Sequence, residues 1–121
     1  MSRRCRRMVM ERLRYEVKEH VLTLLLFLPR EKYWESKRSF VGSASQATVH
    51  PREIFETALH HHASALILVH NHPSGDPMPS RPDIRLTERL AQVGGLMDIP
   101  LADHIIIGDG IYYSFKDADQ L

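Results

Sequence analysis

The sequence is poor in cysteine and has no long apolar run. Cys5 is the one cysteine in 121 residues, so no disulfide can form within the chain, and this usage favours a cytoplasmic protein. The longest apolar stretch, residues 21–28, is interrupted by Thr23 and is well short of the roughly 20 residues that cross a bilayer. Acidic residues break the basic start of the chain, and no small-residue cleavage site follows. We therefore expect no membrane association and no removed signal peptide.

The overall charge is also small, at a formal +1, but it is unevenly distributed. Residues 1–20 carry seven basic and three acidic groups, whereas the rest of the chain is net negative. Such a basic segment is either a nucleic-acid contact or a solvated helix start or loose terminus, and the lack of a recognised binding motif favours the second interpretation. With 43% hydrophobic residues, the composition is that of an ordinary globular protein. We predict a basic N-terminal helix or arm over residues 1–18 and one compact domain over residues 19–121.

The pattern of apolar and turn-forming residues predicts a layered α/β domain with a mixed sheet. Continuous short apolar runs indicate buried strands, and apolar residues at helical spacing indicate amphipathic helices. In the first half of the chain we predict a helix over 8–18, strands over 21–28 and 33–41, a loop over 42–48 and a helix that opens at Pro51. In the second half we predict a strand over 65–69, a turn-rich loop over 70–79 and a helix capped by Ser80 and ended by Gly94. Two strands over 101–107 and 111–115, joined by a turn, complete the domain.

The most informative segment is His70-x-His72 followed by Asp83. Two histidines at i and i+2 at the end of a strand point to the same side of the sheet, so both imidazoles can reach one ion. The loop that follows would return the chain so that Asp83, in the first turn of the next helix, supplies a carboxylate oxygen. Two imidazoles and one carboxylate are a ligand set of catalytic zinc, with a fourth position left for water. Zinc lowers the pKa of such a water to about 7, which makes it a nucleophile at neutral pH.

A purely structural role, without a metal, is the alternative for each of these residues. Ser80 and Asp83 fit an acidic version of a capping box, which satisfies amides at a helix N-terminus without a metal. His70 and His72 could be loop histidines bonded to the backbone. The capping and metal-binding roles of Asp83 are compatible, and the residues taken together favour a metal site.

The remaining histidines are better explained by structure. Residues 60–62 are consecutive histidines, whose side chains point in different directions on a helix, so a polar helix end is favoured over a second metal site. His104 stands beside an apolar strand and is predicted to be a bonded structural histidine. His50 and Arg52 are predicted to be helix-entry residues, with lining of the site as the less favoured role.

The stretch from His70 to Asp83 resembles the signature of the JAB/MPN (JAMM) metalloprotease superfamily: His-x-His, seven residues, Ser, two residues, Asp. The sequence is most similar to the RadC-like branch, with which residues 49–55, 83–87 and 103–108 also agree. This resemblance covers residues 19–121, almost the whole chain. It implies a JAB-type, cytidine-deaminase-like α/β/α fold of three layers, with one zinc ion held by His70, His72 and Asp83.

The resemblance also implies two catalytic residues, Glu19 and Ser80. In this superfamily a glutamate on the first core strand hydrogen-bonds the metal-bound water and acts as general base and acid. Glu19 matches best because it directly precedes the apolar strand; Glu16 is a nearby competitor, and Glu31 and Glu35 follow the strand. Ser80 would donate a hydrogen bond to the oxyanion that forms on the substrate.

The function that the resemblance implies is zinc-dependent hydrolysis of a peptide or isopeptide bond in a protein or peptide substrate. Two departures from the RadC pattern are visible: residues 1–18 contain no helix-hairpin-helix element, and Gly42-Ser43 stands where glycine-threonine is usual. An alternative is a DNA-associated accessory or repair module that uses the basic N-terminus and keeps a structural metal site. DNA binding that depends steeply on salt and is lost without residues 1–14 would favour this alternative.

Overall fold

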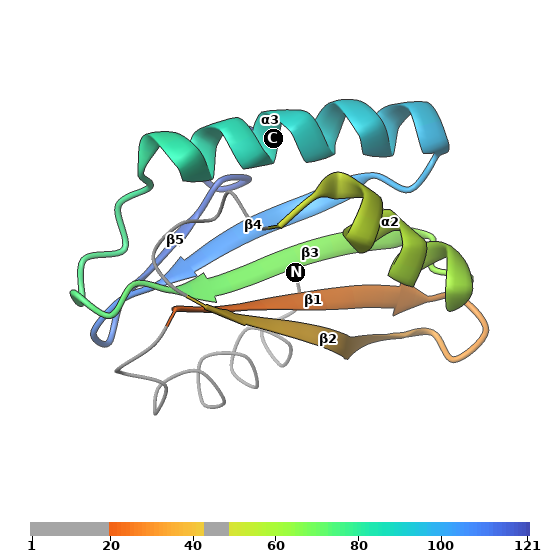
Figure 1. Ribbon diagram of the computed structural model, residues 1–121, viewed down its shortest axis with the longest axis horizontal. Coiled ribbons are helices and arrows are strands. Elements are labelled where there is room, and N and C mark those ends of the chain that lie inside the picture. Colours follow the sequence, from red (N-terminus) through yellow and green to blue (C-terminus); the bar gives the residue numbers. More distant parts are fainter. Residues whose placement is uncertain (1–19, 43–48) are drawn as a thin grey trace.

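The computed structural model describes residues 20–42 and 49–121, which form a five-stranded sheet and two helices (Figure 1). In chain order the elements are β1 (His20–Leu28), β2 (Tyr33–Gly42), α2 (Pro51–His60), β3 (Ala65–Asn71), α3 (Arg81–Met97), β4 (Leu101–Ile107) and β5 (Tyr112–Ser114). The helices and strands predicted from residue 21 onward are confirmed in type and order. The predicted helix over 8–18, the proposed domain boundary and residues 43–48 of the predicted loop lie outside the described residues, and Gly42 belongs to β2.

The sheet is mixed, with the strand order β2-β1-β3-β4-β5. β1 pairs antiparallel with both β2 and β3, whereas β3 and β4 are parallel and are joined by a crossover through α3. Leu22 on β1 is the partner of His70 on β3, and His70 is in turn the partner of Ile106 on β4. The beginning of β1 and the ends of β3 and β4 therefore meet at one edge of the sheet, where the chain also enters α3.

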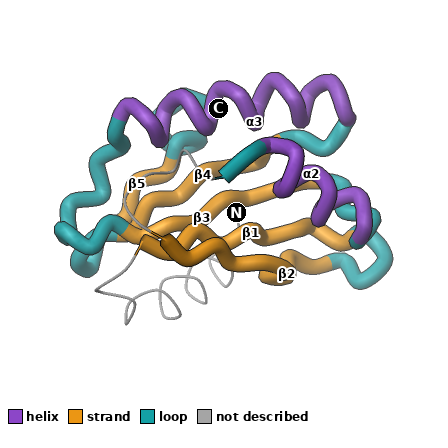
Figure 2. Tube along the Cα trace, viewed as in Figure 1, coloured by secondary structure: helices purple, strands orange, loops and turns teal. Residues whose placement is uncertain are grey.

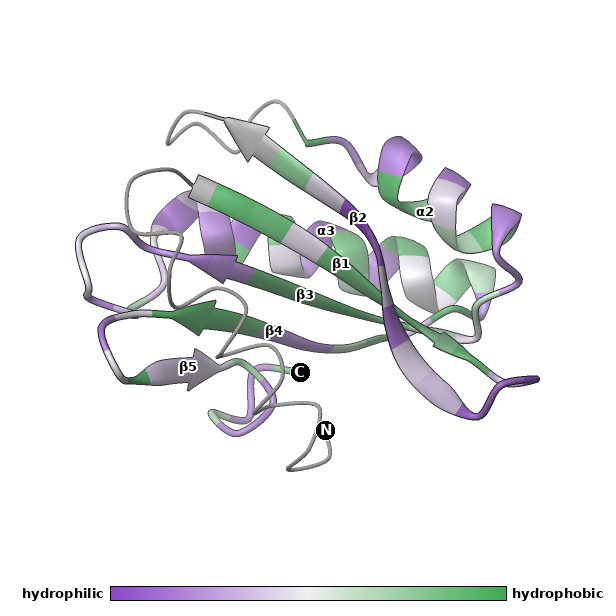
Figure 3. Cartoon of the chain, turned by 90° about the horizontal axis from the view of Figure 1, so that it is seen from below, coloured by the Kyte–Doolittle hydropathy of each residue, from purple (hydrophilic) through white to green (hydrophobic). Residues whose placement is uncertain are grey.

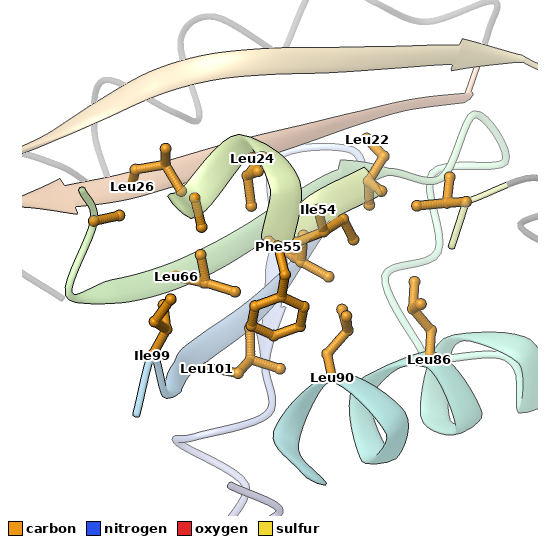
Figure 4. Close-up of a cluster of buried hydrophobic side chains, with 14 of the residues drawn as sticks. Leu22, Leu24, Leu26, Ile54, Phe55, Leu66, Leu86, Leu90, Ile99 and Leu101 are labelled. Atoms are coloured by element: carbon orange, nitrogen blue, oxygen red, sulfur yellow. The ribbon is translucent and has the colours of Figure 1, made fainter. Parts of the chain in front are cut away.

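Both helices cover the same face of the sheet (Figures 1 and 2). Alternate residues of the strands contribute to a cluster with the inner faces of both helices (Figure 4), formed mainly by Leu22, Leu24, Leu26, Ile54, Phe55, Leu66, Leu68, Leu86 and Leu90. None of these side chains is more than 6% exposed. Burying one such side chain contributes about 1.5–3 kcal/mol, so this cluster holds α3 firmly against β3.

The central strands consist largely of apolar residues (Figure 3), and their face opposite the helices has an apolar cluster of its own. This cluster comes from β1, β3 and β4 and consists of Val21, Leu25, Ile67, Val69, Ile105 and Ile107. Strands buried on both faces read as continuous apolar runs, which explains why residues 21–28 and 65–69 could be recognised as strands. Because α2 and α3 lie on one face, the described residues account for two of the three predicted layers.

The C-terminal end of α3 differs from the prediction. Gly94 was expected to end the helix, but the helix continues to Met97. Its C-cap residue is Asp98, which adopts a left-handed conformation (φ 58°). A Cβ atom on Gly94 would lie 2.5 Å from the carbonyl oxygen of Ile99. The glycine is therefore needed for the close return of the chain toward β4, not for a helix cap.

The end of β3 also differs from the prediction. His70 and Asn71 were assigned to a turn-rich loop, but both belong to the strand and pair with Ile106 and Ile107 of β4. The parallel ladder outweighs the turn-forming tendency of the segment that follows. His70 therefore stands on a rigid strand.

α3 is 17 residues long and carries charged residues such as Arg85, Glu88 and Arg89 on its exposed side. No helix in the described part of the chain is long and apolar enough to cross a membrane.

Candidate metal centre

Strand β3 and the segment after it place the two histidines. The His70 side chain is only 2% exposed. The backbone N–H of His72 donates to the Ile107 carbonyl over 2.8 Å, so the chain stays attached to β4 beyond the strand. Nδ1 of His72 lies 2.8 Å from the Asp76 carbonyl oxygen. A carbonyl oxygen cannot donate, so Nδ1 carries a proton and the second ring nitrogen, Nε2, faces the site.

The first turn of α3 places Asp83. Ser80 is the N-cap residue, and its Oγ accepts the Asp83 N–H over 3.3 Å, while Asp83 Oδ2 accepts the Ser80 N–H over 2.7 Å. The predicted capping box is therefore present. The Asp83 side chain is completely buried. Its capping role uses Oδ2 and holds Oδ1 in a fixed position.

The three side chains meet at one point. His70 Nε2 lies 3.2 Å from His72 Nε2 and 3.2 Å from Asp83 Oδ1, and His72 Nε2 lies 3.1 Å from Asp83 Oδ2. Ligands at about 2.0–2.1 Å from a tetrahedral zinc ion are separated from one another by roughly 3.3 Å. In residues 20–42 and 49–121 this is the one group of three or more potential ligands close enough to share an ion.

The cluster contains a buried oxygen that lacks a hydrogen-bond donor. Asp83 Oδ1 has no hydrogen-bond partner among the described residues, although His70 Nε2 is 3.2 Å away. Leaving such an atom unsatisfied costs about 1–3 kcal/mol, or more for a charged group. A cation between the two imidazoles and this oxygen would remove the cost. The residues present therefore fit a metal ion, and nitrogen and carboxylate donors suit a transition metal.

The charge state of Asp83 also fits a metal ion. Burial raises the pKa of the Asp83 carboxyl, but the facing imidazoles of His70 and His72 outweigh this effect and hold the pKa well below its usual range. The hydrogen bond to Asp83 raises the pKa of His72, against the opposing effect of burial. Asp83 is thus an anion at neutral pH, as a metal ligand must be.

Two residues behind the cluster were not predicted to contribute to it. His104 was predicted to be a bonded structural histidine, and it is buried and hydrogen-bonded, but the partner of its Nε2, 2.8 Å away, is Nδ1 of His70. Its Nδ1 lies 2.6 Å from the hydroxyl oxygen of Thr87, and its ring stacks on Phe115 with the centroids 4.9 Å apart. The available signal was a histidine within a continuous apolar strand. Its contact with His70 depends on the register of β3 and β4, which the sequence does not reveal.

Two further contacts hold the edges of the cluster. The side-chain oxygen of buried Asn71 accepts the backbone N–H of Val21 over 2.8 Å, which ties the beginning of β1 to the end of β3. On the other side, the Asp109 N–H donates to the Gly75 carbonyl over 2.9 Å. A Cβ on Gly108 would lie 2.3 Å from that carbonyl oxygen, so only glycine allows the turn after β4 to approach the ligand-bearing loop this closely.

The sequence profile described as RadC-like JAB domain matches residues 1–120. The chain belongs to this family. It is 47% identical over 114 residues to a UPF0758 protein of Alkaliphilus metalliredigens, which covers 94% of this chain and 49% of the relative. A UPF0758 protein of Halalkalibacterium halodurans is 47% identical over 115 residues, covering 95% and 49%, and one of Methanosarcina acetivorans is 49% identical over 106 residues, covering 88% and 46%. The chain therefore spans about half the length of these curated relatives, whose names state no activity.

The structure of this RadC-like JAB domain brings four of the five predicted site residues together. His70, His72 and Asp83 form the cluster, and Ser80 lies exposed at its edge. Glu19 lies outside the described residues, so its role stays a prediction.

The competing glutamates fall into two groups. Glu16 also lies outside the described residues. Glu31 follows β1, and Glu35 pairs with Leu26 in its second half, away from the edge at which β1 meets His70.

His50, His60 and His61 do not belong to the cluster of three potential ligands. His50 and Arg52 line a pocket of about 370 Å³ together with Arg89 and Gln92, and none of the three ligands contributes to it. His60 ends α2, and its ring meets that of His61 edge-on. In the described part of the RadC-like JAB domain, no second group of metal ligands forms around them.

Proposed function

We propose that this RadC-like JAB domain is a zinc-dependent hydrolase that cleaves a peptide or isopeptide bond in a protein or peptide substrate. The observation that carries the proposal is the convergence of two imidazole nitrogens on a buried carboxylate with an unsatisfied oxygen. Structural zinc sites are closed by four protein ligands, whereas catalytic sites have three and keep a position open. The described residues offer three, which favours the catalytic type.

The three ligands differ in their access to solvent. The side chains of His70 and Asp83 are at most 2% exposed, whereas that of His72 is 13% exposed. His70 and Asp83 therefore form the floor of the site, and a substrate amide would approach from the side of His72. Zinc in such a set supplies a Lewis acid and an activated water at neutral pH.

Ser80 is suited to stabilise negative charge on the carbonyl oxygen of the substrate. Its role as helix cap uses an oxygen lone pair, because Oγ accepts the Asp83 N–H. The hydroxyl hydrogen is left for another acceptor, and the side chain stands at the exposed edge of the cluster. A single such donor is worth about 10²–10³ in rate in comparable sites.

Glu19 is proposed to take a proton from the attacking water and pass it to the leaving amine. β1 begins at His20, one residue later, and Leu22 pairs with His70. Asn71 further fixes the backbone of Val21 beside the cluster. These contacts bring the chain to the metal centre within three residues of Glu19.

The test compares Glu19→Gln with Glu16→Gln in zinc-loaded protein. Pools of linear and isopeptide-linked peptides are incubated with each variant, and mass spectrometry detects new termini. Glutamine cannot accept a proton at neutral pH, so we expect Glu19→Gln to keep its zinc and thermal midpoint but to lose about 10²–10⁴ in turnover. Glu16→Gln should cleave like the unaltered chain.

Three results would count against parts of the proposal. If the zinc-loaded chain cleaves neither pool, or if a chelator does not abolish cleavage, it is not a zinc hydrolase of amide bonds. If Glu16→Gln loses turnover and Glu19→Gln does not, the general base is Glu16. If both variants retain turnover, neither glutamate is the base.

A further inference from the structure

A buried chain of hydrogen bonds joins the backbone of one metal ligand to the imidazole of another. The Thr87 hydroxyl oxygen lies 2.9 Å from the Asp83 carbonyl oxygen and 2.6 Å from His104 Nδ1. His104 Nε2 lies 2.8 Å from His70 Nδ1. All four residues are at most 2% exposed, so solvent does not compete for these contacts.

The donors and acceptors along this chain favour one direction. The Asp83 carbonyl can only accept, so the single hydroxyl hydrogen of Thr87 is donated to it. The Thr87 oxygen then accepts the N–H of His104 Nδ1, which leaves His104 Nε2 as an acceptor. His70 must therefore carry its proton on Nδ1 and donate it to His104. The other ring nitrogen of His70, Nε2, is left unprotonated at the point where the three ligands meet.

If the hydrogen bonds ran in the opposite direction, fewer of these polar groups would have a hydrogen-bond partner. That direction would leave two oxygens, of Thr87 and of the Asp83 carbonyl, 2.9 Å apart without a hydrogen between them. His104 is completely buried, which disfavours the charged imidazolium, so the neutral ring has one acceptor nitrogen.

We propose that His104 and Thr87 are positioning residues that hold His70 in the tautomer whose Nε2 can bind the metal. The proposal rests on the metal site of the proposed function and extends it to two residues that touch neither metal nor substrate. It also explains why a ligand on β3 and a ligand on α3 are joined through β4. The ring of His104 is itself fixed, because it stacks on Phe115 with only 7° between the planes.

The direction of the hydrogen bonds can be measured directly. Long-range ¹H–¹⁵N NMR distinguishes the two histidine tautomers, and we expect both His70 and His104 to be protonated at Nδ1 in the zinc-loaded chain. In the metal-free chain His104 should show the same tautomer. A spectrum that shows His70 protonated at Nε2, or His104 protonated at Nε2 alone, would overturn the proposal.

The effect on the metal is tested with Thr87→Val and Thr87→Ser. Valine has the same shape but no hydroxyl, so zinc affinity should fall about 10-fold to 100-fold, the effect typical of losing a partner behind a ligand. Serine keeps the hydroxyl and should restore the affinity. The matched control is Thr57→Val in α2, because Thr57 donates the same bond to the carbonyl four residues back, over 3.1 Å, away from the cluster.

Unchanged zinc affinity in Thr87→Val, or an equal loss in Thr57→Val, would contradict the proposal. If Thr87→Val does not fold, the tautomers of His70 and His104 in the unaltered chain test the proposal on their own. Neither measurement uses a substrate, so a chain that shows the expected tautomers and affinities but cleaves no peptide would overturn the proposed function alone.

Discussion

At the scale of single residues, Ser80 has two roles that substitutions can separate. Its oxygen caps α3, and its hydrogen is proposed to reach the substrate. Replacing an N-cap serine by alanine costs about 1 kcal/mol, whereas glycine costs only a few tenths. Both substitutions remove the hydroxyl.

We therefore expect Ser80→Gly to keep the stability of the unaltered chain within a few tenths of a kcal/mol but to lose about 10²–10³ in turnover. Ser80→Ala should lose the same turnover and about 1 kcal/mol of stability. Urea unfolding and single-turnover cleavage provide the two readouts. Full turnover in Ser80→Gly would show that the residue is a cap and nothing more.

The sequence predicted that His70, His72 and Asp83 come together because their spacing is local: they lie within one strand, one loop and one helical turn. It did not predict that His104 and Thr87 support His70. Their contacts require that β4 lie beside β3 in a particular register and that α3 pack over both. Periodicity along the chain contains no information on that register.

At the scale of elements, the glycines of α3 show how one residue type can carry different signals. Gly94 was predicted to end the helix, but it instead lies where the backbone at Ile99 packs closely against the helix. Its neighbour Gly95 is exposed, and a Cβ there would meet nothing within 4 Å. The pair offers a matched comparison within one helix.

Gly95→Ala should stabilise the chain by up to about 1 kcal/mol, because alanine is the better helix former. Gly94→Ala gains the same propensity but drives a Cβ against the backbone oxygen of Ile99, so we expect it to destabilise the chain by about 1–3 kcal/mol. Urea unfolding of both variants is the measurement. Stabilisation by both would mean that the return of the chain can shift at little cost.

At the scale of the whole molecule, the topology rather than any single element assembles the site. The antiparallel pairing of β1 with β3 and the parallel pairing of β3 with β4 bring three distant segments to one edge. The order of elements was predictable, and the resemblance implied the fold. The strand order itself follows from no local pattern, since it is decided by which faces pack together.

The basic segment is expected to be dispensable for the chemistry, because every proposed site residue lies at or after Glu19. Deleting residues 1–7 should leave turnover within a few-fold of the full chain, when folding is confirmed by circular dichroism. The alternative function, a DNA-associated module, instead makes this segment essential for DNA binding. That binding should depend steeply on salt and disappear when residues 1–14 are removed. Loss of turnover in a folded deletion variant would assign the segment to substrate capture.

The central claim is that His70, His72 and Asp83 hold one zinc ion, and metal content tests it most directly. Chains purified without chelator and reconstituted with zinc are dialysed and measured by elemental analysis, with Glu88→Ala on the exposed side of α3 as the control for Asp83→Ala. We expect about one zinc per chain for the unaltered protein and for Glu88→Ala, and strongly reduced zinc in Asp83→Ala, which loses a ligand. A value near zero for the unaltered chain, or full zinc in Asp83→Ala, would contradict the claim.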